Sequence, residues 1–173
     1  MPELLIRPET AADFSAVDQV LRQAFPGSQE ARLVSALRRR SGFEPALSLV
    51  TTLAGPVVGH VLFTPIVIEG AAATTASLAL APVAVRPAFQ RRGVGGRLIE
   101  AGLAAARQLG YCSVIVLGHP GYYPRFGFEP AGRWGIEAPF AVPAEAFMAL
   151  ELAPGALTGA AGTVRYPAEF VAA

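Results

Sequence analysis

The chain has 173 residues, of which 53% are hydrophobic and 16% are charged, and its formal net charge is +1. This composition is typical of a compact soluble protein and excludes a disordered one. The small net charge gives no reason to expect nucleic acid as a partner, and the apolar runs are too short to span a membrane. We therefore expect a single domain over residues 1–173.

The first residues and the cysteine content both favour a cytoplasmic protein. Met1–Glu9 has neither a basic n-region nor an apolar h-region, so we expect no signal peptide. Cys112 is the single cysteine of the sequence, which excludes an internal disulfide and is typical of a reducing compartment.

The N-terminal segment predicts a strand and then an amphipathic helix. Leu4–Arg7 is a short apolar stretch that ends at a proline. Thr10 and Asp13 have the spacing of a capping box, and apolar side chains recur at helical spacing over residues 14–25. The next residues, Pro26 and Gly27, end this helix.

A second helix and a hairpin follow. Ser28 can cap a helix that ends near Arg38–Arg40, and this arginine run is interpreted as a solvated helix end rather than a binding patch. Leu47–Leu53 and Val57–Ile68 predict two strands of a hairpin, because a Gly-Pro turn separates two apolar runs.

The middle of the chain predicts a strand, a turn and a long helix. Leu78–Val85 is an apolar run interrupted by Pro82, which predicts a bulge. An amphipathic helix follows over residues 94–109, and Gly110 is a suitable C-cap. Ser113–Leu117 then predicts a buried strand.

The C-terminal part predicts short elements joined by irregular segments. We expect a short helix near Tyr122–Phe126 and strands at Ala146–Leu152 and Thr163–Tyr166, with Gly- and Pro-rich connections at 132–145 and 153–162. Strands dominate and helices lie between some of them, which indicates a mixed α/β sheet covered on both faces.

A turn rich in glycine and arginine, Gln90–Gly96, joins the central strand to the long helix. Unpaired N–H groups and the helix dipole make such a turn an anion site, and arginines add forked donors. A P-loop would need a lysine, and the chain has none; a dinucleotide fold would need a glycine at position 98, which is Leu98. An ordinary strand-to-helix connection with surface arginines is the simpler alternative.

The segment Gln90–Gly95 resembles the Q/R-x-x-G-x-G/A pyrophosphate loop of the GNAT superfamily of acyl-CoA-dependent N-acetyltransferases. The resemblance extends from Leu5–Pro8 to Tyr122–Phe128. It implies the GNAT fold, an α/β fold with a mixed, mostly antiparallel central sheet, splayed central parallel strands and helices on both faces. It also implies acetyl-CoA as cosubstrate and an amine as acceptor.

The resemblance assigns the cofactor to the central strand and the turn. The extended pantetheine arm would pair with the backbone of Val83 and Val85, and the Val83 N–H would hold the thioester carbonyl. The diphosphate would lie on the N–H groups of Arg92–Gly96. The residues expected to bind acetyl-CoA are Val83, Ala84, Val85, Gln90, Arg91, Arg92, Gly93, Val94, Gly95 and Gly96.

Transfer also needs an acid and a base. Tyr123 precedes Gly127-Phe128 as in the family's Y-x-x-x-G-F pattern, whose tyrosine faces the cofactor sulfur; Tyr122 is the alternative. Histone-type members carry a base on the central strand, and that position here is Ala79. The candidate bases are therefore His60, His119 or an ordered water, and a covalent role for Cys112 is disfavoured because buried cysteines are usually inert.

The sequence thus predicts an N-acetyltransferase that moves acetyl from acetyl-CoA directly to an amine of a small molecule or peptide. A non-catalytic acyl-CoA-binding or sensing module is the alternative. Neither a metal nor a membrane partner is expected, and a homodimer is compatible with the sequence. Glu69, Glu129 and Glu137 are candidates for holding a cationic substrate, and nothing selects among them.

Overall fold

The computed structural model describes residues 3–172, and their contacts divide the chain into two compact units that interleave along the sequence. The first unit contains the chain up to Thr64, Ala81–Ala105 and the chain from Ala168. The second unit contains Pro65–Leu80 and Ala106–Pro167. Two long strands, β3 (Val57–Glu69) and β4 (Thr74–Val85), contribute residues to both units.

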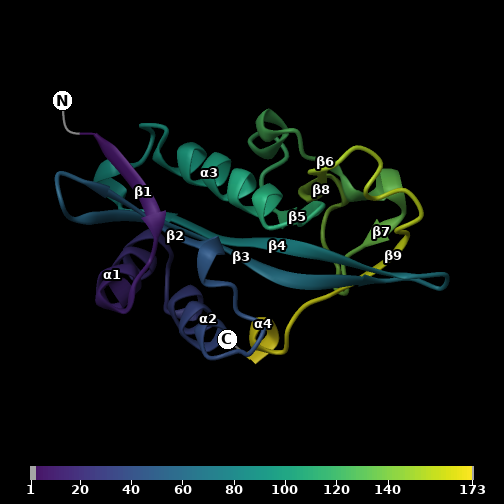
Figure 1. The fold of residues 1–173 in the computed structure, drawn as a ribbon, viewed down its shortest axis with the longest axis horizontal. Helices are drawn as coiled ribbons and strands as arrows, with labels where there is room; N and C mark the ends of the chain where they lie inside the picture. Colours follow the sequence, from purple (N-terminus) through teal and green to yellow (C-terminus); the bar gives the residue numbers. More distant parts are fainter. Residues whose placement is uncertain (1–2, 173) are drawn as a thin grey trace. The chain divides into compact units, whose positions relative to one another are not determined.

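The first unit is a sheet with helices on both faces. Strands β1 (Leu4–Pro8) and β2 (Ser48–Leu53) pair antiparallel, and β2 pairs antiparallel with β3, beside which β4 lies. Figure 1 shows two helices against one face of these strands and a third against the other. The helices are α1 (Phe14–Ala24) and α2 (Gln29–Arg38) on one face, and α3 (Val94–Gln108) on the other; the short α4 (Glu169–Ala172) lies beside α2.

Apolar side chains at helical spacing form the core of this unit. Val17 and Leu21 of α1 and Val34 of α2 pack with Val50 and Leu62 of the sheet, and all five are almost fully buried. On the opposite face, a Cβ added at Gly59 would lie 2.9 Å from the Leu98 side chain, and one at Gly102 would overlap the Phe63 ring. Glycine therefore lets α3 approach the sheet closely.

The second unit contains the remaining strands. β5 (Ser113–Leu117) runs parallel to β4, with Leu78 opposite Val114 and Ala79 opposite Ile115. β8 (Phe147–Glu151) pairs antiparallel with β5 and with the two-residue β6 (Glu129–Pro130). β9 (Gly162–Arg165) pairs antiparallel with β3 and parallel with β7 (Ile136–Glu137). The result is a mixed sheet in which antiparallel pairs predominate, as predicted.

Most predicted elements are confirmed, with shifted ends. The capping box of Thr10 and Asp13 is present, but it caps the start of a 3-10 helix, Ala11–Asp13, that precedes α1. Ser28 lies at the N-cap of α2, but the predicted cap bond is absent there; its hydroxyl instead accepts a bond from Arg32 Nη1 at 2.8 Å. β4 begins at Thr74 rather than Leu78 and continues through the cis peptide bond between Ala81 and Pro82.

The strand β7 and the helix α4 were not predicted. The segment 132–145, expected to be an irregular connection, contains β7, and α4 follows the last strand. β7 has only two residues, too few to show a periodic pattern, and it forms because β9 lies alongside it.

Candidate active site

The end of β4 and the turn that follows it are tied together by side chains. Arg86 donates from Nε to the Val57 carbonyl at 2.8 Å and from Nη1 to Gln23 Oε1 at 3.0 Å. Gln90 then donates from Nε2 to the Val85 carbonyl at 3.0 Å. These bonds hold the start of the turn against the strand, so the first helical residues are presented at a fixed place.

Two residues of the turn have left-handed backbone. Arg91 has φ +63° and Gly93 has φ +78°, and a Cβ at Gly93 would meet open space. Gly93 is therefore suited to its position by backbone conformation rather than by lack of room. Arg91 adopts a conformation that costs a residue with a side chain about 1–2 kcal/mol. The turn reverses the chain so that α3 begins at Val94.

The helix start carries N–H groups that precede the first helical bond. That bond runs from the Arg97 N–H to the Gly93 carbonyl, with an N–O distance of 3.1 Å. The N–H groups of Val94, Gly95 and Gly96 therefore have no acceptor within the helix. Gly95 and Gly96 are only partly buried, so an anion can reach this end of the helix.

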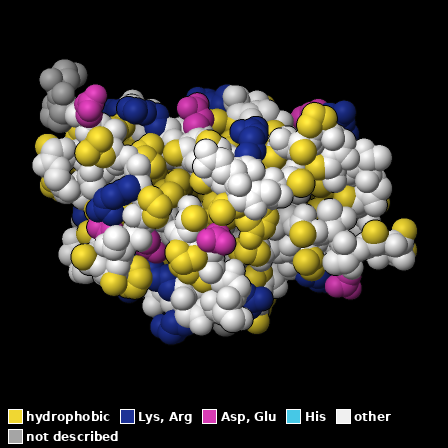
Figure 2. All heavy atoms as spheres, viewed as in Figure 1, with side chains coloured by type: hydrophobic (Ala, Val, Ile, Leu, Met, Phe, Trp, Pro, Cys, Tyr) yellow, Lys and Arg dark blue, Asp and Glu magenta, His cyan; other side chains and the backbone are white. Residues whose placement is uncertain are grey.

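Arginines surround this helix start. Arg91, Arg92 and Arg97 are exposed, and Arg92 lies over the Phe89 ring with its Cζ 5.7 Å from the ring centroid. An open pocket of about 620 Å³ lies next to them, lined by Glu3, Leu4, Leu53, Phe89, Arg92, Val94 and Arg97. Elsewhere on the face shown in Figure 2, basic and acidic side chains are interspersed rather than gathered into one extended basic surface.

β4 leads directly into this turn. Among the residues that the structure describes, its parallel register with β5 covers only Leu78 and Ala79, and β4 continues to Val85. Ala84 is buried in the core, while Val83 and Val85 are partly exposed. The side chains of these residues therefore pack like those of an ordinary strand.

Tyr123, in the second unit, lies in a cluster of aromatic rings. Its ring meets those of Tyr122 and Phe128 edge to face, with centroids 5.2 and 5.8 Å apart. Gly118 leaves room for it, because a Cβ there would overlap the Tyr123 ring. Burial raises the pKa of the Tyr123 phenol to about 12, and the nearby Tyr122 acts in the same direction. The phenol is therefore protonated at neutral pH.

His119 shapes the turn that carries Tyr123. Its side chain is exposed, and its carbonyl accepts the N–H groups of Tyr122 at 3.0 Å and Tyr123 at 3.3 Å. The sequence predicted the His119 imidazole as a candidate base, with a turn residue before Pro120 as the simpler alternative. The main-chain role could not be recognised from the sequence, because any residue type supplies a carbonyl.

His60, the other candidate base, is completely buried in the first unit. Its Nε2 lies 3.0 Å from Ser48 Oγ, and the structure contains no partner for its Nδ1 among the described residues. Burial lowers the pKa of His60 to about 4; Glu9 opposes this shift and Arg38 reinforces it. This environment supports a structural role, because the imidazole is fully buried and its Nε2 contacts Ser48.

Two of the three carboxylates considered for substrate binding already have partners in the second unit. Glu69 lies 3.5 Å from Arg165, and Glu129 lies 2.6 Å from Arg133. Glu137, on β7, is exposed. Over residues 3–172, no group of three or more His, Cys, Asp or Glu side chains could hold a metal ion, and no helix is long and apolar enough to cross a membrane.

Comparisons with known proteins show the family to which the chain belongs. Residues 5–131 match the family described as "Acetyltransferase (GNAT) domain". The chain is 45% identical over 135 residues to the uncharacterized N-acetyltransferase YjhQ of Escherichia coli K12, covering 78% of this chain and 75% of YjhQ. It is 34% identical over 167 residues to the uncharacterized N-acetyltransferase YhbS of the same strain, covering 96% and 98% of the two chains.

Two solved structures resemble the whole chain. The structure of YhbS from E. coli in complex with CoA has a TM-score of 0.91 at 35% identity, covering 99% of this chain and 93% of that one. A GNAT family acetyltransferase from Brucella melitensis in complex with acetyl-CoA has a TM-score of 0.79 at 34% identity, covering 97% and 98%.

Proposed function

Because the chain belongs to the GNAT family of acetyltransferases, we propose that it moves an acetyl group from acetyl-CoA directly to an amine of a small molecule or peptide. The observation that carries this proposal is the start of α3, where free N–H groups, two left-handed residues and three exposed arginines meet. We also propose that both units belong to one acetyltransferase domain and that the protein works in the cytoplasm.

In this proposal the turn holds the diphosphate of acetyl-CoA. The N–H groups of Arg92–Gly96 would donate to its oxygens, and Arg91 and Arg97 would add charge. The absence of an acceptor for the first N–H groups of α3 supports the assignment, since these donors suit phosphate oxygens. The related YhbS and B. melitensis structures hold CoA and acetyl-CoA.

The backbone of β4 would hold the pantetheine arm. The pairing of β4 with β5 ends at Ala79, and Val83 and Val85 lie beyond this point on β4. An extended ligand that contains amides can pair with such a strand. The Val83 N–H would donate to the thioester carbonyl, whose oxygen gains charge as the amine attacks. One such donor is worth about 3 kcal/mol at the transition state.

Tyr123 would assist the leaving thiolate. Its pKa of about 12 lies above the value near ~8.5 of a thiol, so complete proton transfer from phenol to thiolate would be uphill. Donation of a hydrogen bond to the sulfur as the C–S bond breaks is the role that fits this acidity. The proton that the amine loses would pass to His119 or to water, since His60 is buried.

A thiol-release assay tests the proposal. The purified chain is incubated with acetyl-CoA and a panel of amines, peptides and amine-bearing antibiotics, and free CoA is measured with a thiol reagent. Amine-dependent release of CoA, with the acetylated amine identified by mass spectrometry, is the expected result. Binding of acetyl-CoA without turnover across the panel would instead favour a non-catalytic acyl-CoA-binding module.

A further inference from the structure

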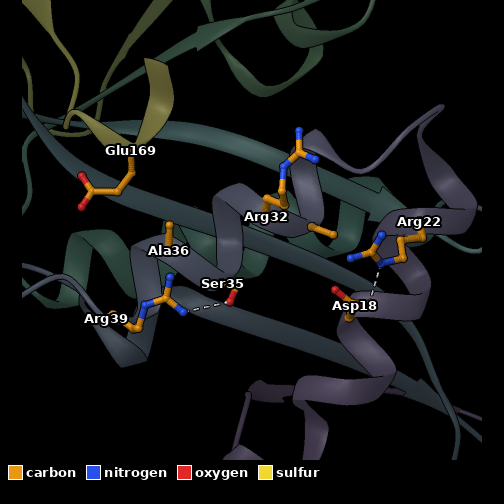
Figure 3. A pocket seen from close by; sticks show the side chains of 8 residues that line it. Asp18, Arg22, Arg32, Ser35, Ala36, Arg39 and Glu169 are labelled. Atoms are coloured by element: carbon orange, nitrogen blue, oxygen red, sulfur yellow. Dashed lines mark hydrogen bonds and ion pairs between the residues drawn. The ribbon is translucent and has the colours of Figure 1, made fainter. Parts of the chain in front are cut away.

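A second pocket lies in the first unit, between α1, α2 and α4 (Figure 3). Its volume of about 360 Å³ is in the range of small-ligand sites. The strands of this unit separate the pocket from α3, which lies on their opposite face (Figure 1). A ligand here would therefore be separate from the proposed diphosphate site at the start of α3.

One face of α2 forms the wall of this pocket. Arg32, Ser35, Ala36 and Arg39 recur at positions i, i+3, i+4 and i+7, so they lie along one side of the helix. The two smaller residues between the arginines leave a hollow, and the arginine stems can lie along its sides. In Figure 3 the Arg39 guanidinium turns toward Ser35, whereas the Arg32 guanidinium points away from Arg39.

The carboxylates around the pocket already have cationic partners. Asp18 lies 2.7 Å from Arg22 Nε, and Glu169 lies 3.2 Å from Arg40 Nη1. These pairs neutralise the negative charge of the lining residues, which leaves Arg32 and Arg39 as the uncompensated charges of the pocket.

Both of these arginines bond only to hydroxyl groups. Arg32 Nη1 donates to Ser28 Oγ at 2.8 Å, and Arg39 Nη1 donates to Ser35 Oγ at 3.4 Å. Neither has a carboxylate partner within residues 3–172. The 3.4 Å bond is long for a hydrogen bond, so Arg39 can exchange it for a ligand oxygen at little cost. The Ser35 hydroxyl is then free to donate as well.

We propose that this pocket binds a compact dianion, either a phosphate ester or a dicarboxylate, between Arg32 and Arg39. A guanidinium presents two parallel N–H donors that match a pair of carboxylate or phosphate oxygens. In the structure the Arg32 guanidinium bonds back to Ser28 and the Arg39 guanidinium to Ser35, so both side chains must turn toward Ala36 to share one ligand. Two guanidiniums on one helix face then match a ligand that carries two negative charges.

The test uses the full chain labelled with ¹⁵N, observed through the arginine Nε–Hε signals. Signals of Arg32 and Arg39 are assigned with the Arg32→Gln and Arg39→Gln variants. Inorganic phosphate, malonate and sodium chloride of matched ionic strength are added in separate titrations. Because each signal reports one side chain, phosphate bound at the start of α3 does not interfere. Arg107→Gln is the matched control, since Arg107 is exposed on α3 and lies outside the pocket.

Saturable shifts of the Arg32 and Arg39 signals with a common dissociation constant are expected for phosphate or malonate. Arg39→Gln should weaken the response of Arg32 about tenfold, and Arg107→Gln should leave it within about twofold. If phosphate binds more tightly than malonate, the ligand of the pocket is a phosphate ester. If malonate binds more tightly, the ligand is a dicarboxylate. Shifts that do not saturate, that sodium chloride reproduces, or that keep the same dissociation constant in Arg39→Gln would overturn the proposal. Both substituted arginines are exposed, so the variants are expected to fold.

Discussion

The Arg38 guanidinium and the Glu9 carboxylate form a two-bond ion pair, with Nε–Oε1 and Nη2–Oε2 distances of 3.0 and 2.8 Å. Their side chains are only 12% and 3% exposed. Ser48 Oγ donates to Glu9 Oε1 at 2.7 Å, because an ionised carboxylate can only accept. Ser48 must then accept from His60 Nε2, which places the proton of the neutral imidazole on Nε2.

Removal of one member of this buried pair is expected to destabilise the fold strongly. Glu9→Gln leaves the Arg38 charge buried without a counter-charge, which should lower the free energy of unfolding by about 3 kcal/mol. Urea denaturation followed by circular dichroism measures the change. Arg22→Gln is the control, because it breaks the exposed pair with Asp18 and should cost less than about 1 kcal/mol. If both variants lose the same free energy of unfolding, burial of the Glu9–Arg38 pair does not strengthen its effect on stability.

His60 makes stability depend on pH. Its pKa is about 4 in the folded chain, whereas histidine in an unfolded chain titrates near ~6.5. Between these values the unfolded chain binds a proton that the folded chain does not, so the free energy of unfolding falls as pH drops from about 6.5 toward 4. The loss from this group should approach about 3 kcal/mol at pH 4. Above pH 6.5, His60 does not change the free energy of unfolding with pH.

Urea midpoints measured from pH 4 to 8 test this expectation. His60→Asn removes the titrating group and should flatten the decline, even if the variant is less stable throughout. His119→Asn is the matched control, because His119 is the other histidine and its side chain is exposed. A decline that is unchanged in His60→Asn would rule out His60 as its source.

Asp13 should give a second pH dependence at lower pH. The hydrogen bond from Arg7 holds the pKa of the Asp13 carboxyl well below its usual range; burial opposes this shift, and the Thr10 N–H adds to it. A carboxyl with a depressed folded pKa stabilises the fold above its unfolded pKa of about 3.9 and loses this effect as pH falls below it. Asp13→Asn should therefore be most destabilising near neutral pH, with a difference from the native chain that shrinks below pH 4. A constant difference would show that the charge is not responsible.

Gly95→Asp tests the placement of acetyl-CoA. The new carboxylate would lie at the start of α3 and repel the diphosphate, so the affinity for acetyl-CoA should fall by at least about tenfold. Isothermal calorimetry provides the dissociation constants. Gly132→Asp is the control, because it adds the same charge at a glycine whose Cβ would meet open space. Equal affinity in the native chain and Gly95→Asp would exclude this loop as the diphosphate site.

Tyr123→Phe tests the catalytic assignment. The substitution keeps the ring within its aromatic cluster and removes the hydroxyl, so kcat should fall about 10²-fold while acetyl-CoA affinity barely changes. Tyr122→Phe is the control in the same cluster. If kcat falls only in Tyr122→Phe, the neighbouring phenol has the catalytic role instead.

The lysine-free sequence allows a clean test of direct amine transfer. The chain has 14 arginines and no lysine, so its side chains offer no ε-amine. Incubation with acetyl-CoA alone should add at most one stable acetyl group, at the N-terminal amine. Intact mass spectrometry after alkaline hydroxylamine removes labile esters and thioesters from the count. Two or more surviving acetyl groups would indicate acylation chemistry other than amine transfer.

Sequence patterns predicted the elements of the fold where a regular pattern was long enough to recognise. The helical spacing of Phe14, Val17 and Leu21 indicated α1. The glycines and arginines between an apolar run and an amphipathic helix indicated the turn at Gln90–Gly96. β7 escaped prediction because its two residues depend on β9 for their pairing. Local pattern cannot reveal a strand whose hydrogen bonds come entirely from a distant segment.

The candidate site was predictable to a similar extent. The turn Gln90–Gly96, the proposed diphosphate site, is contiguous in sequence, so its glycines and arginines could be recognised together. The environment of His60 was not, because its partners Glu9, Arg38 and Ser48 come from separate elements. The carbonyl of His119 that orients Tyr123 was equally hidden, since its role depends on backbone geometry rather than residue type.

The left-handed backbone of Arg91 has a consequence for engineering heat tolerance. Glycine or asparagine would occupy φ +63° with less strain, so Arg91→Gly should raise the melting temperature by relieving roughly 1 kcal/mol. The same change would remove a cation from the start of α3. Selection for thermostability alone would therefore favour variants that bind anions less well at this turn, and libraries should be screened for both properties together.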